Sequence, residues 1–428
     1  MENTPNDRAA MLREPNFRWL LVGGITSMLG DQFTLIALPW LMLKMTGDSL
    51  HLGLVIALMG VPRAIFILLG GAIVDRYSPK RVLMLTKYAN TVLLGALAAL
   101  VLSGQATPAL VYALALAIGL ASAFSIPSGS AIMPSVVAPQ HMQAANSMMM
   151  GLRQLTMLAG PVLAGLLIAL GGDGAGQMGD ARGIGLAFAF DSFTYLFSSW
   201  TLARVQVRQD APRPAPQGLF SAVGEGLAMV WQDRDMRTCF GYWALVMLFV
   251  GGAFQVALPV LADTRLSGAG ALGLLMGAHG SGTLLGMIVS GVKGKARIGG
   301  TLGSTILAID AIVGALLMPF GFIHAAWQGA LLMLVMGALG GFMQVAVFSW
   351  VQGRVPPAML GRAMSIFMFI FMGVAPLSAA SAGYLMQFVP LGTLFVGSGA
   401  FLIVMAALAF ALTPMRRMRD GAAPAPAP

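Results

Sequence analysis

Charged residues are scarce in this sequence. They make up 10% of the chain, whereas 57% of its residues are hydrophobic. A soluble globular domain carries roughly 25% charged residues, so this chain cannot cover a water-facing surface of its size. The mean hydropathy of +0.82 points the same way. The composition therefore excludes an ordinary soluble protein and predicts a protein embedded in a lipid bilayer.

Cysteine and metal-ligand clusters are also nearly absent. The one cysteine, Cys239, excludes an intramolecular disulfide and a paired-cysteine metal site. The sequence has no P-loop and no clustered histidines, so we predict no metal, no cofactor and no enzymatic activity. The net charge of +9 would suit a nucleic-acid binder. The cations, however, are scattered between apolar runs and form no basic face, so no nucleic acid is expected as a partner.

Long apolar runs fill most of the chain. A hydrocarbon core about 30 Å thick needs roughly 20 apolar residues per helix. Candidate spans begin near Phe17, Leu50, Val82, Pro108, Met142, Gly183, Thr238, Ala271, Gly299, Ala325, Arg362 and Pro390. We therefore predict an all-α membrane protein of about twelve transmembrane helices. The expected parts are an N-terminal segment (1–16), a six-helix bundle (17–204), a linker with an amphipathic surface helix (205–237), a second six-helix bundle (238–413) and a disordered tail (414–428).

The two predicted bundles repeat one another weakly. Gly71-Ala-Ile-Val-Asp75 recurs as Gly286-Met-Ile-Val-Ser290, and Pro161 matches Pro376 at the same offset. Parallel repeats of six helices are typical of transporters whose substrate site lies between the halves.

Lys and Arg are distributed asymmetrically between the two sides of the predicted membrane. Twenty of the 25, with Lys87 counted among them, fall on the side of the N-terminus, and only Lys44, Arg182 and Arg265 fall in the opposite loops. Because cytoplasmic loops are enriched in Lys and Arg, both termini are predicted to be cytoplasmic. We expect a multi-pass protein of the plasma membrane, specifically a bacterial inner membrane, that functions as a monomer.

The most specific motif follows the second predicted helix. It reads Gly71-Ala-Ile-Val-Asp75-Arg76-Tyr-Ser-Pro-Lys80-Arg81 and resembles the signature loop of the major facilitator superfamily. The resemblance extends over about residues 14 to 413 and implies the fold of that family. The proposed gating residues are Gly71, Asp75, Arg76, Lys80 and Arg81, a charge latch that favours one arrangement of the halves. The alternative is that the cations only set the topology.

Two further patterns concern the direction of transport. Gly160-Pro161-Val-Leu-Ala-Gly165 on helix 5 resembles the antiporter motif of exporters in this superfamily, although small-residue packing is an alternative. The spacing of Asp31…Ala37-Leu-Pro39, of the Asp75 loop, and of Ala145-Asn146 before Arg153-Gln154 resembles the enterobactin-exporter and macrolide-efflux branch. One feature departs from the exporters: no cation occurs between Pro108 and Pro134, where their helix 4 carries an arginine.

Ionisable residues within membrane helices are costly and mark functional candidates. Counted at 1.5 Å per residue from the cytoplasmic end, Asp31, Arg63 and His279 lie at about 18 to 21 Å, near the membrane midplane. Asp31 shares a polar stripe with Ser27 and Thr34 at helical spacing. We interpret Asp31 as a protonation switch with Arg63 as its cation; a static Asp31–Arg63 pair is the alternative.

The remaining polar candidates are weaker. His279 lies among glycines, so a packed neutral histidine is at least as good an interpretation as a functional one. Gln255 and Gln344 are candidates for a mildly polar cavity lining. Asp191 and Asp310 fall on helices 6 and 9, which the resemblance places on the outside of the bundle, and we interpret both as structural polar partners.

The sequence as a whole predicts a secondary transporter that exports a small molecule, such as a drug, a siderophore or an amphipathic metabolite, by proton antiport with alternating access. Two alternatives stay open. One is an uptake carrier or facilitator of the same superfamily, and the other is a membrane receptor or structural protein that transports nothing.

Overall fold

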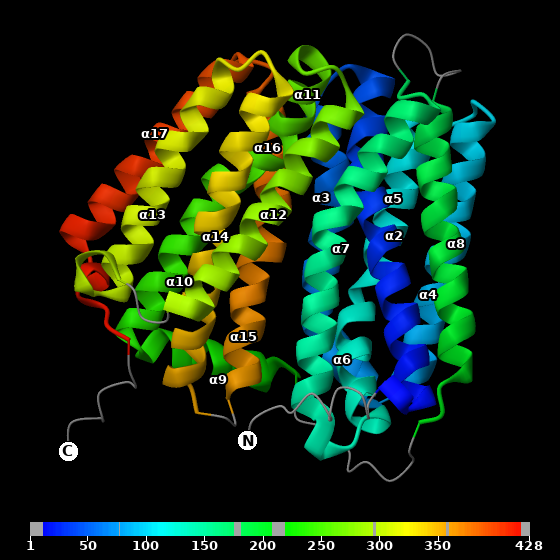
Figure 1. The fold of residues 1–428 in the computed structure, drawn as a ribbon, viewed down its shortest axis with the longest axis horizontal. Coiled ribbons are helices and arrows are strands. Elements are labelled where there is room, and N and C mark those ends of the chain that lie inside the picture. Colours follow the sequence, from blue (N-terminus) through cyan, green and yellow to red (C-terminus); the bar gives the residue numbers. More distant parts are fainter. Residues whose placement is uncertain are drawn as a thin grey trace. The chain divides into compact units, whose positions relative to one another are not determined.

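Twelve long helical stretches make up most of the computed structural model, and no β-strand occurs in the part of the chain it describes (Figure 1). The structure describes residues 12–420 apart from Tyr77, 175–180, 208–218, 294–296 and 357–358, and leaves out the side chains of 67–76, Ile126, Pro139, 219–223 and Lys293. Eleven of the stretches are long and apolar enough to cross a membrane. The twelfth, Arg182–Arg204, has 23 residues and carries several polar side chains. The predicted all-α fold of about twelve spans is confirmed.

The chain divides into two compact units. Unit 1 comprises residues 1–47, 58–219 and 268–273, and unit 2 comprises residues 48–57, 220–267 and 274–428.

The helices of the N-terminal half begin close to the expected positions. They are α2 (Pro15–Thr46), α3 (Ser49–Arg76), α4 (Pro79–Leu102), α5 (Pro108–Ala123), α6 (Ser125–Val136), α7 (Met142–Gly171) and α8 (Arg182–Arg204). Three of them start with proline, whose fixed φ suits the first helical turn. α2 ends at Gly47, which adopts the left-handed conformation with φ 66° that glycine tolerates at a helix C-terminus.

The C-terminal half follows the same plan with more interruptions. Its helices are α9 (Leu219–Gln232), α10 (Arg234–Val246), α11 (Leu258–Arg265), α12 (Ala269–Lys293), α13 (Leu302–Leu317), α14 (Ala326–Arg354), α15 (Leu360–Phe369), α16 (Ala375–Leu385) and α17 (Leu391–Leu412). Two π-helical segments, Met247–Gly251 and Ala253–Ala257, join α10 to α11, and a third, Ile370–Val374, joins α15 to α16. Such π-helical turns are frequent at functional sites.

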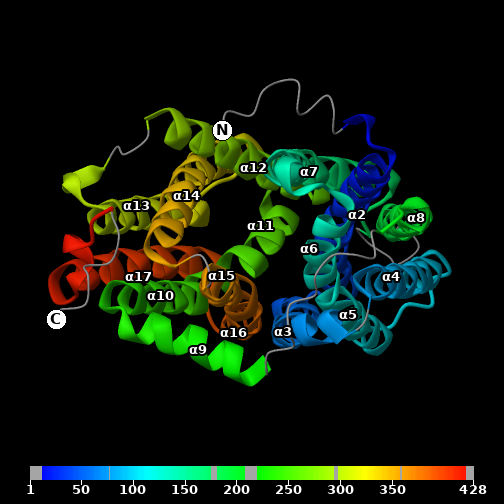
Figure 2. The same cartoon turned by 90° about the horizontal axis from the view of Figure 1, so that it is seen from below.

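The linker helix α9 crosses the ends of other unit-2 helices (Figures 1 and 2). The Arg362 guanidinium of α15 forms an ion pair with Glu225, and a Cβ on Gly226 would lie 3.1 Å from Cβ of Arg362. Leu227 and Trp231 of α9 are exposed. A helix was expected here over Leu219 to Trp231, and the structure has it.

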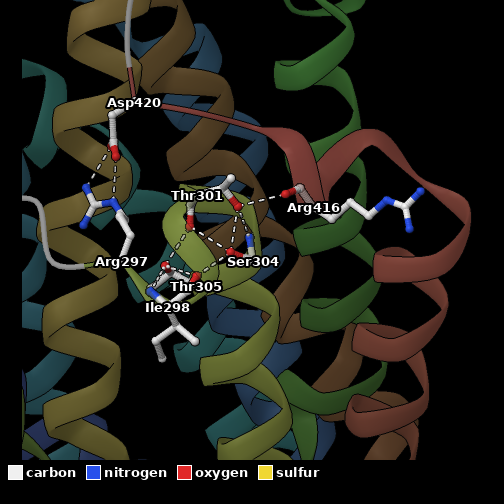
Figure 3. Close-up of polar contacts among 7 residues, drawn as sticks. All are labelled: Arg297, Ile298, Thr301, Ser304, Thr305, Arg416 and Asp420. Carbon is white, nitrogen blue, oxygen red and sulfur yellow. Dashed lines mark hydrogen bonds and ion pairs between the residues drawn. The ribbon is translucent and has the colours of Figure 1, made fainter.

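The chain end is more ordered than expected. Residues 414–420 were assigned to a disordered tail, but Pro414–Arg417 forms a 3-10 helix. Figure 3 shows how the segment is held: Thr301 donates to the carbonyl of Arg416 at 2.8 Å, and Arg297 forms a bidentate ion pair with Asp420 at 2.8 Å. The Gly303 N–H donates to the carbonyl of Met418 at 3.1 Å. The loop between α12 and α13 is therefore fastened to the segment after α17.

Candidate functional site

Helices α2, α4 and α8 pack side by side in unit 1 (Figure 2). Glycines let the backbone of α2 come close to α8. A Cβ on Gly23 would lie 1.9 Å from Oγ1 of Thr201, and a Cβ on Gly30 would lie 2.1 Å from Oγ1 of Thr194. Because a side chain at either glycine would collide with α8, the close approach depends on these positions.

A polar seam fills this contact. We use the name for the side chains of Ser27 and Thr34 on α2, Lys87 on α4, and Asp191, Thr194, Tyr195 and Ser198 on α8, each of which is buried. Asp191 is 1% exposed; one carboxylate oxygen accepts a hydrogen bond from Thr34, and the other lies 3.1 Å from Oγ1 of Thr194. The stripe of Ser27 and Thr34 predicted from helical spacing therefore contacts a partner helix.

Asp31 lies beside the seam, in the middle of α2. Its side chain is exposed on unit 1, and its Oδ1 accepts a hydrogen bond of 2.6 Å from the Tyr195 hydroxyl. Charged groups on three other helices act on it: Arg63 on α3, Lys87 on α4 and Arg153 on α7. Asp31 is thus a carboxyl group that is accessible on one side and tied to the seam on the other.

The predicted partner Arg63 does not form a contact ion pair with Asp31. Among the described residues, no carboxylate oxygen lies within 4.0 Å of the Arg63 guanidinium, and its Nε is buried without a hydrogen-bond partner. The interpretation of a static Asp31–Arg63 pair is therefore wrong for this structure. Arg63 acts on Asp31 only through its charge at longer range.

Lys87 is the residue that sequence reasoning misplaced. It was counted with the cytoplasmic cations, but it lies inside α4 and is only 7% exposed. Its Nζ donates to Oγ of Ser198 at 2.6 Å and to Oγ of Ser27 at 3.2 Å, and it lies 5.6 Å from the ring centre of Tyr195. Asp191 was interpreted as a structural polar partner, and it shares the seam with Lys87. For Lys87, an ionisable residue within an apolar run was the available signal.

The gating loop is described only in part. The side chains of Gly71, Asp75 and Arg76 lie outside the described residues, although the backbone places all three in the last turns of α3. Lys80 donates from Nζ to the carbonyls of Ala203 at 3.3 Å and Val205 at 2.6 Å. A cation there stabilises the C-terminal end of α8, where helix carbonyls have no intrahelical partner. The side chain of Arg81 is exposed.

The motif Gly160-Pro161-Val-Leu-Ala-Gly165, predicted for helix 5, lies on α7, where α7 packs closely against α2 and α12. A Cβ on Gly160 would lie 2.5 Å from Cβ of Gln32 on α2, and a Cβ on Gly165 would lie 2.8 Å from Cα of Gly273, one of the α12 residues that belong to unit 1. Pro161 lies inside α7, and its carbonyl would be 2.7 Å from a Cβ on Gly273. The packing role of these small residues is evident in the contacts.

The candidates of unit 2 do not come together in a comparable network. Nδ1 of His279 is buried without a hydrogen-bond partner. The backbone carbonyl of His279 would be 2.2 Å from a Cβ on Gly337, where glycines bring α12 and α14 close together. Gln255 lies in the second π-helical segment, with its Oε1 buried and unpartnered. The side chain of Gln344 is exposed on α14, and Asp310 on α13 lies near Tyr242 of α10.

An ion-pair network lies where α10 begins. Arg354, at the end of α14, contacts Asp233 at 2.6 Å and Asp235 at 2.9 Å, and Asp233 also caps α10 by accepting from the N–H groups of Asp235 and Met236 at 3.0 Å. Burial alone would raise the pKa of Asp233. The hydrogen bonds from Arg354 and from the two N–H groups outweigh it, so the pKa lies below its usual value.

Ionisable side chains within membrane helices mark ion and substrate pathways. The fold is that of a polytopic membrane protein with ionisable side chains buried among its helices. The chain matches the Major Facilitator Superfamily over residues 20–380 and belongs to that family. This confirms the resemblance seen in its motifs.

Relatives and solved structures agree with this assignment. The chain is 25% identical over 415 residues to the enterobactin exporter EntS of Salmonella paratyphi A, covering 95% of this chain and 94% of the relative. It is also 25% identical to an uncharacterised MFS-type transporter, y4rN, of Sinorhizobium fredii, with coverage of 93% and 95%.

Similar folds occur in the nucleoside transporter NupG, in a mutant form, with a TM-score of 0.72 at 14% identity and coverage of 92% and 99%. A bacterial homologue of the iron transporter ferroportin gives a TM-score of 0.65 at 17% identity, with coverage of 92% and 98%. Members of this family are transporters and not enzymes, as the sequence predicted.

Proposed function

We propose that the protein is a secondary active transporter that exports a small molecule in exchange for protons, by alternating access. The observation that carries the proposal is Asp31, an exposed carboxyl group halfway along a membrane helix that accepts a hydrogen bond from Tyr195. A carboxyl group in this position can bind a proton or release it to water. It is therefore proposed as the coupling group.

The cost of keeping a charged residue within the membrane is comparable to the energy that a charge gains from the membrane potential. A charged residue at the centre of a membrane helix costs about 2.5 to 3.5 kcal/mol on insertion scales, so a chain that keeps one must gain from it. Moving one elementary charge across 100 mV is worth about 2.3 kcal/mol. Protonation of one carboxyl group is thus the right size of event to couple the two fluxes.

Export is favoured over uptake by two observations. Relatives named as enterobactin exporters match nearly the whole chain, and the helix 5 motif at Gly160 and Pro161 resembles that of exporters. The proposed substrates are a drug, a siderophore or an amphipathic metabolite. Gln255 is the best candidate for a substrate-binding residue in unit 2, because its buried oxygen has no partner and it lies in a π-helical segment. Gln344 and His279 are weaker candidates.

The proposed setting is a bacterial inner membrane with both termini in the cytoplasm and the monomer as the functional form. The asymmetric distribution of Lys and Arg supports the orientation.

Counterflow in proteoliposomes tests the proposal. Vesicles containing the purified protein are loaded with members of a compound panel and placed under an imposed pH gradient, with a pH-sensitive dye inside. We expect at least one compound to exchange and its movement to drive protons the opposite way. Asp31→Asn should retain exchange of the compound and lose proton movement.

Two results would contradict the proposal in different ways. Transport that is insensitive to the gradient in the wild type would indicate a facilitator. Proton movement in the same direction as the compound would indicate an uptake symporter.

A further inference from the structure

The hydroxyl protons of the seam can be assigned from its distances. A threonine or serine hydroxyl has one proton to donate and lone pairs to accept. The hydroxyl of Thr194 lies 2.7 Å from the carbonyl oxygen of Asp191 and 3.1 Å from Oδ1 of the same residue. Its single proton goes to the nearer carbonyl. A proton on Oδ1 of Asp191 would then make the 3.1 Å contact to Oγ1 of Thr194 a full hydrogen bond, which a carboxylate could only share with the nearer carbonyl.

The other oxygen of Asp191 completes this assignment. It accepts from the Thr34 hydroxyl, so a neutral carboxylic acid makes one accepted and one donated hydrogen bond here. The side chain is 1% exposed, and among the described residues no cation lies within 4.0 Å of it. Because burial without a contact cation disfavours a carboxylate, both the geometry and the surroundings suit the neutral acid.

Lys87 has the opposite assignment. The hydroxyl of Ser198 donates to the carbonyl of Gly23 at 2.5 Å, and that of Ser27 donates to the carbonyl of Gly24 at 3.1 Å. Both serines therefore present lone pairs to Nζ of Lys87, which an ammonium group satisfies as donor, with the face of the Tyr195 ring beside it. Lys87 of α4 is thus held as a cation by its hydrogen bonds to Ser27 of α2 and Ser198 of α8.

We infer that Asp191 is a neutral acid and that the seam therefore carries a single positive charge, that of Lys87. This charge stays at a fixed position and favours the ionised form of Asp31. The groups that face Asp31 are then Arg63 on α3, Lys87 on α4, Arg153 on α7, and Tyr195 with neutral Asp191 on α8. The fourth membrane span, α5 and α6, has no cation between Pro108 and Pro134. Lys87 supplies a cation from the third span, α4.

The inference rests on the proposed function for its consequence in transport. When Asp31 takes a proton from water, one O–H bond forms at its carboxylate and no other bond changes. Asp191 and Lys87 keep their protons throughout. The seam therefore sets how readily Asp31 is protonated without itself exchanging a proton.

Variants of three seam residues test this. Asp191→Asn keeps both hydrogen bonds, since its amide oxygen accepts from Thr34 and its N–H donates to Thr194, and we expect wild-type proton coupling. Lys87→Met should move the pH dependence of substrate-driven proton movement to higher pH, because Asp31 loses a nearby cation, and Lys87→Arg should restore it. Asp31→Asn should lose coupling. Asp310→Asn, at a half-buried carboxyl group in unit 2, is the control and should leave the pH dependence unchanged.

Infrared difference spectra between the wild type and each variant give a measurement that does not need transport. We expect the carbonyl stretch of a protonated carboxylic acid at neutral pH, absent from Asp191→Asn and retained in Asp31→Asn. Loss of proton coupling in Asp191→Asn, an unchanged pH profile in Lys87→Met, or a carboxylic-acid band that survives Asp191→Asn unaltered would each overturn the inference. A wild type that moves no protons would overturn the proposed function, and the infrared band would still decide the protonation of Asp191.

Discussion

Gly30→Ala should strongly destabilise the protein. The new Cβ would lie 2.1 Å from Oγ1 of Thr194 and 2.2 Å from Oδ1 of Asp191. Neither side chain can easily move, because Asp191 is also held by Thr34 and the Thr194 hydroxyl is bonded to the helix backbone. Overpacking of this kind costs about 1 to 3 kcal/mol and a broken buried hydrogen bond about 1 to 3 kcal/mol more. We therefore expect a loss of about 2 to 6 kcal/mol.

A control lies on the same helix. A Cβ on Gly24 would lie 3.5 Å from Cε of Met149, an ordinary contact with the end of a flexible side chain. Gly24→Ala should therefore be neutral or stabilise by up to about 1 kcal/mol, the difference in helix propensity. Thermal denaturation of the two variants in detergent, at one heating rate because unfolding of such proteins is often irreversible, ranks them.

The comparison has a clear refuting result. If Gly30→Ala and Gly24→Ala denature at the same temperature at that heating rate, α2 and α8 do not approach as closely as described. The seam would then lack the tight contact on which its hydrogen-bond assignment depends.

Three further predictions concern other regions. Asp75→Asn should slow transport while leaving equilibrium substrate affinity nearly unchanged, as measured by counterflow and binding; a collapse of affinity with normal turnover would remove the gating assignment. Arg354→Ala should lower the denaturation temperature near neutral pH, and the difference should shrink below about pH 4, because the low pKa of Asp233 makes its ion pair stabilising above the unfolded-state pKa and lost as Asp233 is protonated. A constant difference across that range would exclude the ion pair as the cause. On a Cys239→Ser background, cysteines introduced at positions 210 and 420 should resist external labelling in intact cells, and labelling at either position would reverse the proposed orientation.

The sequence was a good guide wherever the signal is local. Apolar runs predicted twelve helices, and helical spacing predicted that Ser27 and Thr34 share a face with Asp31. The failures involve contacts between distant residues. Lys87 follows three cations that were assigned to the cytoplasmic side, and its burial depends on contacts with Ser27 and Ser198, 60 and 111 residues away.

Asp191 was interpreted as a structural polar partner, and it accepts a hydrogen bond from Thr34, 157 residues away. The prediction for the chain end failed for the same reason as that for Lys87. Disorder was predicted from residue 414, but the local sequence holds no information about the hydrogen bond from Thr301 to Arg416, 115 residues apart. The three π-helical segments carried no signal that was read from the sequence.

The fastened chain end has a practical consequence for handling the protein. Purification handles and fluorescent fusions are often joined to a membrane protein just after its last helix, with the residues beyond removed. Here that cut, after Leu412, would remove the partners of Arg297 and Thr301 before α13 and of Gly303 in its first turn. A fusion that follows residue 428 keeps Asp420 and all three contacts, and is therefore the safer design.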